Sequence, residues 1–249
     1  MGQYWTRKGD QEDIDEKTIN PFTEIITKAD RSYPKRKPLK VALFDLDGTL
    51  FDTEAQYTIY WGSVGRKYNL GDDFADRIKG STLTRILGFF PDPKDQEDVS
   101  RGIDEYEAKM HYDFVPGALE FLRDLKSNGV ICAVVTSSNQ NKMASVRRQL
   151  PEFDSLFDRV FTAEEFTRSK PAPDCYLLGL EVYGVEREEC VVFEDAFNGL
   201  ESAMAAGIFT IGLATYNSPE AIQDKCNYVM KDFTDFDYNK LIKVLDEQN

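Results

Sequence analysis

Histidine is almost missing from this sequence, with one residue in 249. Serine–histidine–aspartate hydrolysis, histidine-rich zinc sites and phosphorylated histidine intermediates all depend on this residue type. The only candidate is His111, and the surrounding segment Lys-Met-His-Tyr-Asp-Phe contains no recognisable motif. We therefore expect a structural or surface role for His111, and we expect carboxylates, hydroxyls and lysine to carry any chemistry.

An excess of positive charge and long apolar runs are missing too. Lys and Arg number 30 against 44 Asp and Glu, which gives a net charge of -14. Nucleic-acid binding proteins normally carry a basic face and anionic membranes attract basic surfaces, so this balance argues against both partners. No stretch is long and apolar enough for a membrane span, and the N-terminus shows no apolar signal region. We expect a soluble, cytoplasmic monomer.

Cysteine is scarce and forms no Cys-x-x-Cys motif of the kind found in zinc and redox sites. Two of the four cysteines lie in or beside apolar, strand-like runs. We therefore expect buried free thiols in a reducing compartment for the four cysteines, Cys132, Cys175, Cys190 and Cys226.

Three regions differ in character along the chain. Residues 1–37 are polar, end in a basic, proline-containing linker and could form a short helix over 20–29. Residues 53–114 show only helical spacing, in pieces over 57–68, 74–78, 83–90 and 96–110. Residues 38–52 and 115–249 alternate apolar strands with amphipathic helices, which predicts an α/β core with a doubly wound parallel sheet. The predicted strands cover 40–45, 130–135, 159–162, 190–193, 208–213 and 228–230.

The segment 41–52 is the most informative stretch, with the sequence Val-Ala-Leu-Phe-Asp-Leu-Asp-Gly-Thr-Leu-Phe-Asp. Its apolar half predicts a buried strand, and Asp45, Asp47 and Asp52 follow within a few positions. Neighbouring carboxylates at the end of a buried strand repel each other unless a cation or a shared proton intervenes. This order of residues predicts a divalent-metal site more strongly than an acidic turn.

Polar residues also follow three further strands. Because the carboxyl ends of parallel strands meet at one edge of the sheet, we expect all four groups to converge across a crevice. The later groups are Thr136, Ser137 and Ser138 after the second strand, Lys170 in the loop after the third, and Glu194 with Asp195 after the fourth.

Together these groups fit phosphoryl transfer. Mg²⁺ held by Asp45 and Asp195, with Glu194 as a further candidate, would neutralise the oxygens of a phosphate monoester. Asp45 could then attack phosphorus to form an aspartyl-phosphate. Asp47, two residues further on, is placed to protonate the leaving oxygen and later to deprotonate water.

The same segments resemble the four motifs of the haloacid dehalogenase superfamily. They are Phe-Asp-Leu-Asp-Gly-Thr-Leu-Phe-Asp, Val-Val-Thr-Ser-Ser, Ser-Lys-Pro-Ala-Pro-Asp and Val-Phe-Glu-Asp-Ala-Phe-Asn-Gly, in that order. The resemblance covers residue 39 to the C-terminus, and the helical insert resembles the cap of the β-phosphoglucomutase-like subgroup. It implies a Rossmann-like core and a main-chain carbonyl of Asp47 as a further Mg²⁺ ligand. It also implies that Thr136 and Lys170 stabilise the phosphate.

Further substrate contacts are expected around these motifs. Candidates in the core are Gly48, Ser137, Ser138 and Asn139, and candidates facing the site from the cap are Glu54, Tyr57, Trp61, Lys79 and Thr82. Because aromatic residues at helical spacing usually belong to a core, Trp61 is the weakest of these candidates. We expect Asp52 to act in a hinge or turn.

Departures from the mutase pattern favour a phosphatase for a small sugar or polyol phosphate. Tyr57 stands where the mutase has a histidine, and Leu83 stands where it has an arginine that grips a second phosphate. Arg85 is shifted by two residues and would point elsewhere on a helix. The alternatives are β-phosphoglucomutase and, more remotely, a non-catalytic protein that binds phosphorylated metabolites.

Overall fold

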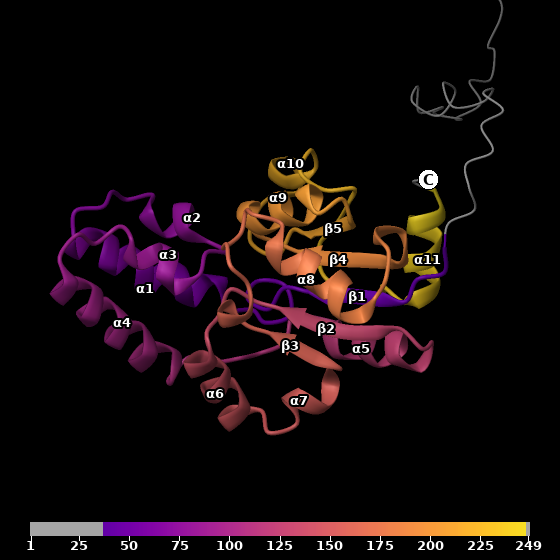
Figure 1. Ribbon diagram of the computed structural model, residues 1–249, viewed down its shortest axis with the longest axis horizontal. Coiled ribbons are helices and arrows are strands. Elements are labelled where there is room, and N and C mark those ends of the chain that lie inside the picture. Colours follow the sequence, from indigo (N-terminus) through magenta and orange to yellow (C-terminus); the bar gives the residue numbers. More distant parts are fainter. Residues whose placement is uncertain (1–36, 248–249) are drawn as a thin grey trace, which may run out of the picture. The chain divides into compact units, whose positions relative to one another are not determined.

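A computed structural model describes residues 37–247 of the chain. Its centre is one parallel sheet of six strands in the order β3-β2-β1-β4-β5-β6 (Figure 1). The predicted extension 1–37, apart from its last residue, and the predicted helix 20–29 lie outside the described residues. The strands are β1 Val41–Phe44, β2 Ile131–Val135, β3 Arg159–Phe161, β4 Cys190–Glu194, β5 Phe209–Leu213 and β6 Tyr228–Met230.

Strand β1 lies in the middle of the sheet, where the strand order reverses. Val41 pairs with Ile131 of β2 on one side and with Cys190 of β4 on the other. The chain places β2 and β3 on one side of β1, and then β4, β5 and β6 on the other side. The connections that follow β1 and β4 therefore run toward opposite edges of the sheet. Such a reversal opens a crevice at the carboxyl ends of the strands, where ligands of open α/β sheets bind.

Helices cover both faces of the sheet because the side chains of each buried strand point alternately to either face. Ala42 and Phe44 of β1 face a core that includes α5 (Ala118–Ser127), α6 (Gln140–Gln149) and α11 (Tyr238–Glu247). Val41 and Leu43 face a second core with α8 (Asp174–Tyr183) and α9 (Phe197–Ala205). Every strand of this central region is therefore apolar on both sides, which explains the continuous apolar runs in the sequence.

Between β1 and β2 the chain forms a separate group of helices, the cap. Its helices are α1 (Glu54–Lys67), α2 (Phe74–Ile78), α3 (Leu83–Leu87) and α4 (Pro93–Glu107), and they surround an apolar core of their own. The carboxyl ends of the strands face these helices (Figure 1). The chain leaves the core near Asp52 and returns near Asp113, and the Asp52 amide donates to the Asp113 carbonyl oxygen at 2.9 Å. The predicted fold class, an α/β core with an inserted helical cap, is confirmed. The precise domain boundaries remain a prediction.

Most predicted elements lie within a few residues of the observed ones, with two kinds of exception. Helix α4 begins at Pro93, before the predicted start at residue 96, because Asp92 accepts a capping hydrogen bond from the Lys94 amide at 2.8 Å. Four short helices were not predicted, since segments of three or four residues show no period. They are α7 Phe153–Leu156, α10 Pro219–Ile222, and the 3-10 turns η1 Ala163–Glu165 and η2 Arg187–Glu189.

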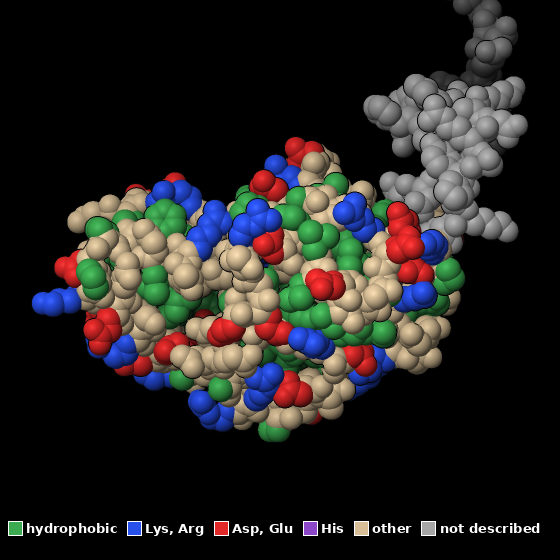
Figure 2. Space-filling view, viewed as in Figure 1, with side chains coloured by type: hydrophobic (Ala, Val, Ile, Leu, Met, Phe, Trp, Pro, Cys, Tyr) green, Lys and Arg blue, Asp and Glu red, His purple; other side chains and the backbone are tan. Residues whose placement is uncertain are grey.

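Three features can be compared with the sequence analysis, namely membrane spans, surface charge and the cysteines. Among the helices of residues 37–247, none combines the length and apolar character needed to cross a membrane. On the face drawn in Figure 2, Lys and Arg side chains lie among Asp and Glu side chains rather than in one basic patch. The cysteine side chains form no disulfide within the described residues, and Cys132, Cys175 and Cys190 are buried as predicted while Cys226 is half-buried.

Candidate active site

Lys170 joins the ends of β1 and β4 from the loop before α8. Its Nζ lies 2.6 Å from Asp45 Oδ1, 2.7 Å from Glu194 Oε1 and 3.3 Å from the Val135 carbonyl oxygen. The side chain is fully buried, and its ammonium also lies 4.9 Å from the centre of the Tyr176 ring. Although burial opposes the charge, Asp45 and Glu194 hold the pKa of Lys170 well above its ordinary value. The predicted convergence of these strand ends is therefore present.

Glu194 has its hydrogen-bonding capacity filled by the protein. Besides Lys170, its Oε1 accepts from the Tyr176 hydroxyl at 3.2 Å. Its Oε2 accepts from the amides of Asp195 and Ala196 at 2.8 and 2.9 Å, where the chain turns into α9. Gly199 is needed beside it, because a Cβ there would lie 1.6 Å from Glu194 Oε1. Glu194 therefore acts as a fixed anchor for Lys170 and is less available as a direct metal ligand than Asp45 or Asp195.

Asp195 is the second carboxylate that could hold a cation. Its Oδ1 accepts from the Thr49 hydroxyl at 2.9 Å. The acidic turn passes over its Oδ2 at Gly48, where the backbone has a φ of +79° and a Cβ would lie 2.1 Å from that oxygen. The Gly48 carbonyl accepts from the Thr215 hydroxyl at 2.6 Å, which fixes the turn in this position. Only glycine allows the turn to come this close to Asp195.

The donor set fits a divalent cation. Oxygen atoms of Asp45, Glu194 and Asp195 lie within 4.8 Å of one another, and all three side chains are buried. Burial raises the pKa of Asp45 to about 7 despite Lys170, and burial with the charge of nearby Glu54 raises the pKa of Asp195 well above its ordinary value. Lys170 pairs with Asp45 and Glu194 but not with Asp195, so three carboxylates lie beside one ammonium and the cluster has a deficit of positive charge. Hard carboxylate oxygens in this arrangement are the ligands that Mg²⁺ prefers.

Asp47 is held by three donors in a position facing the cap. Its Oδ1 accepts from the Thr53 hydroxyl at 2.7 Å, and its Oδ2 accepts from the Ser138 hydroxyl at 3.2 Å. Lys142 also donates to Oδ2, and the Lys142 side chain is only 1% exposed. The Lys142 ammonium lies 4.8 Å from the centre of the Tyr57 ring. The sequence analysis missed Lys142 because it belongs to no motif.

Donors for phosphate oxygens line the space between these acids. The Thr136 hydroxyl accepts from the Ser138 amide at 3.0 Å, which leaves its own hydrogen available to donate. Within residues 37–247, the amides of Leu46, Asp47 and Ser137 donate no hydrogen bond to the protein. Together with Lys170, these groups can bind an anion beside Asp45.

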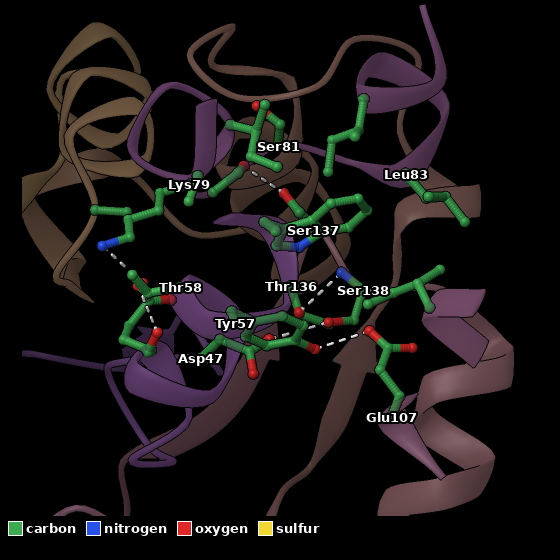
Figure 3. A pocket seen from close by; sticks show the side chains of 18 of the residues that line it. Asp47, Tyr57, Thr58, Lys79, Ser81, Leu83, Glu107, Thr136, Ser137 and Ser138 are labelled. Carbon is green, nitrogen blue, oxygen red and sulfur yellow. Dashed lines mark hydrogen bonds and ion pairs between the residues drawn. The ribbon is translucent and has the colours of Figure 1, made fainter. Parts of the chain in front are cut away.

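A pocket with about 760 Å³ of empty space, part of it open to solvent, extends from Asp45 and Asp47 into the cap. Figure 3 shows Tyr57 in this pocket with its hydroxyl directed toward Glu107. Tyr57 Oη donates to Glu107 Oε1 at 2.8 Å. Glu107 was not predicted, since it lies near the end of α4, more than fifty residues from the acidic motif. Its only sequence signal is a charged residue on a helix face whose other members, Val99 and Ile103, are buried.

Most predicted substrate contacts line the pocket, namely Glu54, Tyr57, Trp61, Lys79, Ser137, Ser138 and Asn139. Trp61 is also part of the cap core, as expected for an aromatic residue at helical spacing. Asn139 is the N-cap of α6, and its side-chain oxygen accepts a hydrogen bond from the Lys142 amide. The roles of these residues remain predictions.

The other predicted contacts lie elsewhere. Thr82 is outside the pocket because it caps α3, where its hydroxyl accepts from the Arg85 amide at 3.4 Å. Gly48 lies over Asp195 instead of lining the pocket, and its amide donates to the Phe51 carbonyl. Neither position supports the predicted direct contact with substrate. The Arg85 guanidinium donates to the Lys170 carbonyl, away from the pocket that Leu83 lines.

His111 and Asp52 are both exposed and lie outside the pocket. The backbone of His111 pairs with the Gln56 side chain through bonds of 2.8 and 3.0 Å. The hydrogen bond from the Asp52 amide to the Asp113 carbonyl oxygen joins the two segments that connect the core to the cap. These positions agree with a surface role for His111 and a hinge role for Asp52.

The sequence is similar to those of two phosphatases over more than two thirds of this chain. The chain is 32% identical over 212 residues to validoxylamine A 7'-phosphate phosphatase of Streptomyces hygroscopicus subsp. limoneus, covering 79% of this chain and 95% of that protein. It is 33% identical over 181 residues to hexitol phosphatase A of Escherichia coli, covering 69% of this chain and 81% of that protein.

A solved structure has the same fold. The β-phosphoglucomutase of Clostridium difficile superposes with a TM-score of 0.70 at 21% identity, covering 84% of this chain and 98% of the other. The sequence pattern of the haloacid dehalogenase-like hydrolases matches residues 42–213, which contain the acidic turn, the cap and the ends of β2 and β4. The chain therefore belongs to the haloacid dehalogenase-like hydrolase family.

Proposed function

We propose that the protein is a Mg²⁺-dependent phosphatase that hydrolyses a small phosphorylated metabolite, a sugar or polyol phosphate, through an aspartyl-phosphate on Asp45. The observation that carries this proposal is the position of Asp45, which shares Lys170 with Glu194 at the floor of a pocket that continues into the cap. Both relatives described above are named as phosphatases, and one name specifies hexitols.

In the first step, a carboxylate oxygen of Asp45 attacks phosphorus and the bond from phosphorus to the leaving oxygen breaks. Asp47 delivers a proton to that oxygen, so the product leaves as a neutral alcohol. The hydrogen bonds from Thr53 and Ser138 hold the Asp47 carboxyl group at the pocket wall for this transfer.

In the second step, Asp47 accepts a proton from water, and the resulting oxygen attacks phosphorus of the aspartyl-phosphate. The Asp45 carboxylate is released together with inorganic phosphate, so both acids return to their starting states. Thr136, Lys170 and the amides of Leu46 and Asp47 bind the phosphate oxygens in both steps. Mg²⁺, when bound by Asp45, Asp195 and the main-chain carbonyl of Asp47, supplies positive charge against the phosphate oxygens.

A mutase is supported less well. It must bind a bisphosphate in two orientations, which requires a second set of cations away from Asp45. Lys79 is the single lysine or arginine among the residues that line the pocket, and it lies 3.4 Å from Glu54 and 3.2 Å from Asp76. Incubation with β-glucose 1-phosphate and a trace of the bisphosphate tests this alternative, because a mutase would form glucose 6-phosphate without free phosphate.

The test of the proposal is phosphate release from a panel of metabolite monophosphates and p-nitrophenyl phosphate, with and without Mg²⁺. We expect Mg²⁺-dependent turnover that Asp45→Asn abolishes, whereas Asp52→Asn, an exposed aspartate of the same segment, retains it. Turnover by Asp45→Asn would contradict the nucleophile, and a lack of phosphate release from the whole panel would favour a binding protein. A cytoplasmic monomer without nucleic-acid or membrane partners also remains a prediction from the sequence.

A further inference from the structure

The cap side of the pocket combines an apolar wall with one buried carboxylate. Trp61, Ile78, Leu83 and Ile103 supply the apolar surface. Glu107, on the last turn of α4, lines the pocket and is only 7% exposed. Acidic side chains are seldom buried to this degree unless they have partners.

Glu107 has half of its hydrogen-bonding capacity unused. Oε1 accepts from the Tyr57 hydroxyl, whereas Oε2 accepts no hydrogen bond within residues 37–247. Oε2 is not enclosed by the protein, so a molecule in the pocket can reach it. A hydroxyl group of a bound molecule would supply the missing donor.

Charge within the pocket disfavours a second anion on that molecule. The lining residues include four carboxylates, on Asp45, Asp47, Glu54 and Glu107, against Lys79 alone. Lys79 lies close to Glu54 and Asp76, and its ammonium lies 3.1 Å from the centre of the Tyr216 ring. The two buried lysines nearby are paired with other acids, since Lys142 binds Asp47 and Lys170 binds Asp45 and Glu194. The Lys79 ammonium donates no hydrogen bond within the described residues, but Glu54 and Asp76 oppose its charge, so a second anion in the cap half would still meet an excess of negative charge.

We propose that Glu107 is the specificity-determining residue for the leaving group: it accepts a hydrogen bond from a hydroxyl of an uncharged alcohol, and it excludes leaving groups that carry a second anion. This inference rests on the proposed phosphatase function and deepens it. Tyr57 positions the Glu107 carboxylate through its hydroxyl, and Asp45 and Asp47 act on the phosphate at the opposite end of the pocket.

The test compares Glu107→Gln with the wild-type protein on four substrates. Sorbitol 6-phosphate, glucose 6-phosphate and glycerol 3-phosphate carry hydroxyls on the leaving group, and p-nitrophenyl phosphate carries none. A hydrogen bond to a charged group contributes about 1.5–3 kcal/mol, so we expect kcat/KM to fall roughly tenfold to 100-fold on the hydroxylated substrates that the wild type hydrolyses. The fall should lie mainly in KM, and p-nitrophenyl phosphate should change less than about twofold. The control is Glu105→Gln, which replaces an exposed glutamate on the same helix.

A second comparison tests whether the pocket excludes substrates that carry a second anion. Wild-type kcat/KM for fructose 1,6-bisphosphate should be at least about 100-fold below that for fructose 6-phosphate, because burying an unpaired anion is costly. Both comparisons are made at pH 8, above the pKa of about 7 to which burial raises Glu107, and Glu107→Gln should narrow this gap because it removes a negative charge from the pocket.

Three outcomes overturn the inference while leaving the phosphatase function intact. They are an equal loss on all four substrates, no loss on the hydroxylated ones, and a wild-type protein that hydrolyses only p-nitrophenyl phosphate. If Glu107→Gln leaves the ratio of kcat/KM for the two fructose phosphates unchanged, Glu107 does not exclude a second anion. A lack of turnover of every substrate contradicts the proposed function instead.

Discussion

The Lys170 ammonium lies almost midway between two carboxylates, 2.6 Å from Asp45 Oδ1 and 2.7 Å from Glu194 Oε1. The two acids follow different strands, so this one cation fixes the ends of β1 and β4 relative to each other. Because Glu194 also accepts two amide hydrogen bonds, it cannot move without disrupting the start of α9. Asp45, the proposed nucleophile, is therefore held by a rigid, buried network.

Replacing Lys170 should affect both stability and activity. Lys170→Met leaves two buried carboxylates without their shared cation, and breaking a buried ion pair in this way costs about 3–5 kcal/mol. We expect a loss of this size in the free energy of unfolding measured with urea, and a fall in kcat of at least about 100-fold. Lys231→Met, at a site whose side chain is 88% exposed, is the control and should change neither quantity. A stable, active Lys170→Met variant would show that the network is dispensable.

Mg²⁺ should stabilise the folded protein through Asp195. A ligand at about 100 times its Kd adds about 2.7 kcal/mol to the free energy of unfolding, so Tm should rise with Mg²⁺ concentration. Asp195→Asn removes a buried negative charge and should stabilise the metal-free protein, yet abolish the rise. Asp224→Asn, at an exposed position, should keep it. If Asp195→Asn shows the same Mg²⁺-dependent rise as the wild type, the cation binds elsewhere.

Asp47→Asn should distinguish substrates by their leaving groups. An alkoxide needs a proton as it leaves, and general acid catalysis contributes about 10²–10⁴-fold. A nitrophenolate ion leaves without one. We expect formation of the aspartyl-phosphate from a sugar phosphate to slow by at least about 100-fold in single-turnover measurements, and formation from p-nitrophenyl phosphate to slow much less. Equal effects on the two substrates would remove Asp47 from the role of acid.

Glu107 should make stability depend on pH. Burial raises its pKa from 4.5 to about 7, and Lys142 and the Tyr57 hydroxyl only partly oppose this rise. Below pH 4.5 the carboxyl group is protonated in both the folded and unfolded states. Between pH 4.5 and 7 the unfolded state ionises while the folded state keeps its proton, so stability falls as the pH rises.

The variant Glu107→Gln lacks this ionisation and can still accept the Tyr57 hydrogen bond. At pH 8 it should be more stable than the wild type by up to about 3 kcal/mol, and this gain should shrink toward pH 5. Urea unfolding across this pH range measures the difference, with Glu105→Gln as the control without pH dependence. A destabilised Glu107→Gln would indicate that this carboxylate supports the fold instead of serving the pocket.

Much of the site in the core could be predicted, because its residues follow the predicted strands in the sequence. Asp45 and Asp47 directly follow a buried strand, and parallel topology brings Lys170 to Asp45 across 125 positions. The cap contacts depend on helix packing, which the sequence does not specify, so Thr82 was expected in the pocket and caps α3 instead.

One feature of the sequence could have indicated that Lys142 has an acidic partner. It lies in the first turn of α6, where the helix dipole disfavours a cation, and such a lysine needs an acidic partner. That partner, Asp47, is 95 positions away, so only the folded structure identifies it.

The most direct test of the account is to trap the nucleophile during turnover. Borohydride reduces an acyl phosphate to an alcohol, so quenching the wild-type protein with borohydride during hydrolysis should convert the side chain of residue 45 to that of homoserine. Peptide mass mapping should find this change only when substrate and Mg²⁺ are present, and never in Asp45→Asn. Reduction at Asp47 instead, or no reduction at any position during measured turnover, would contradict the aspartyl-phosphate on Asp45.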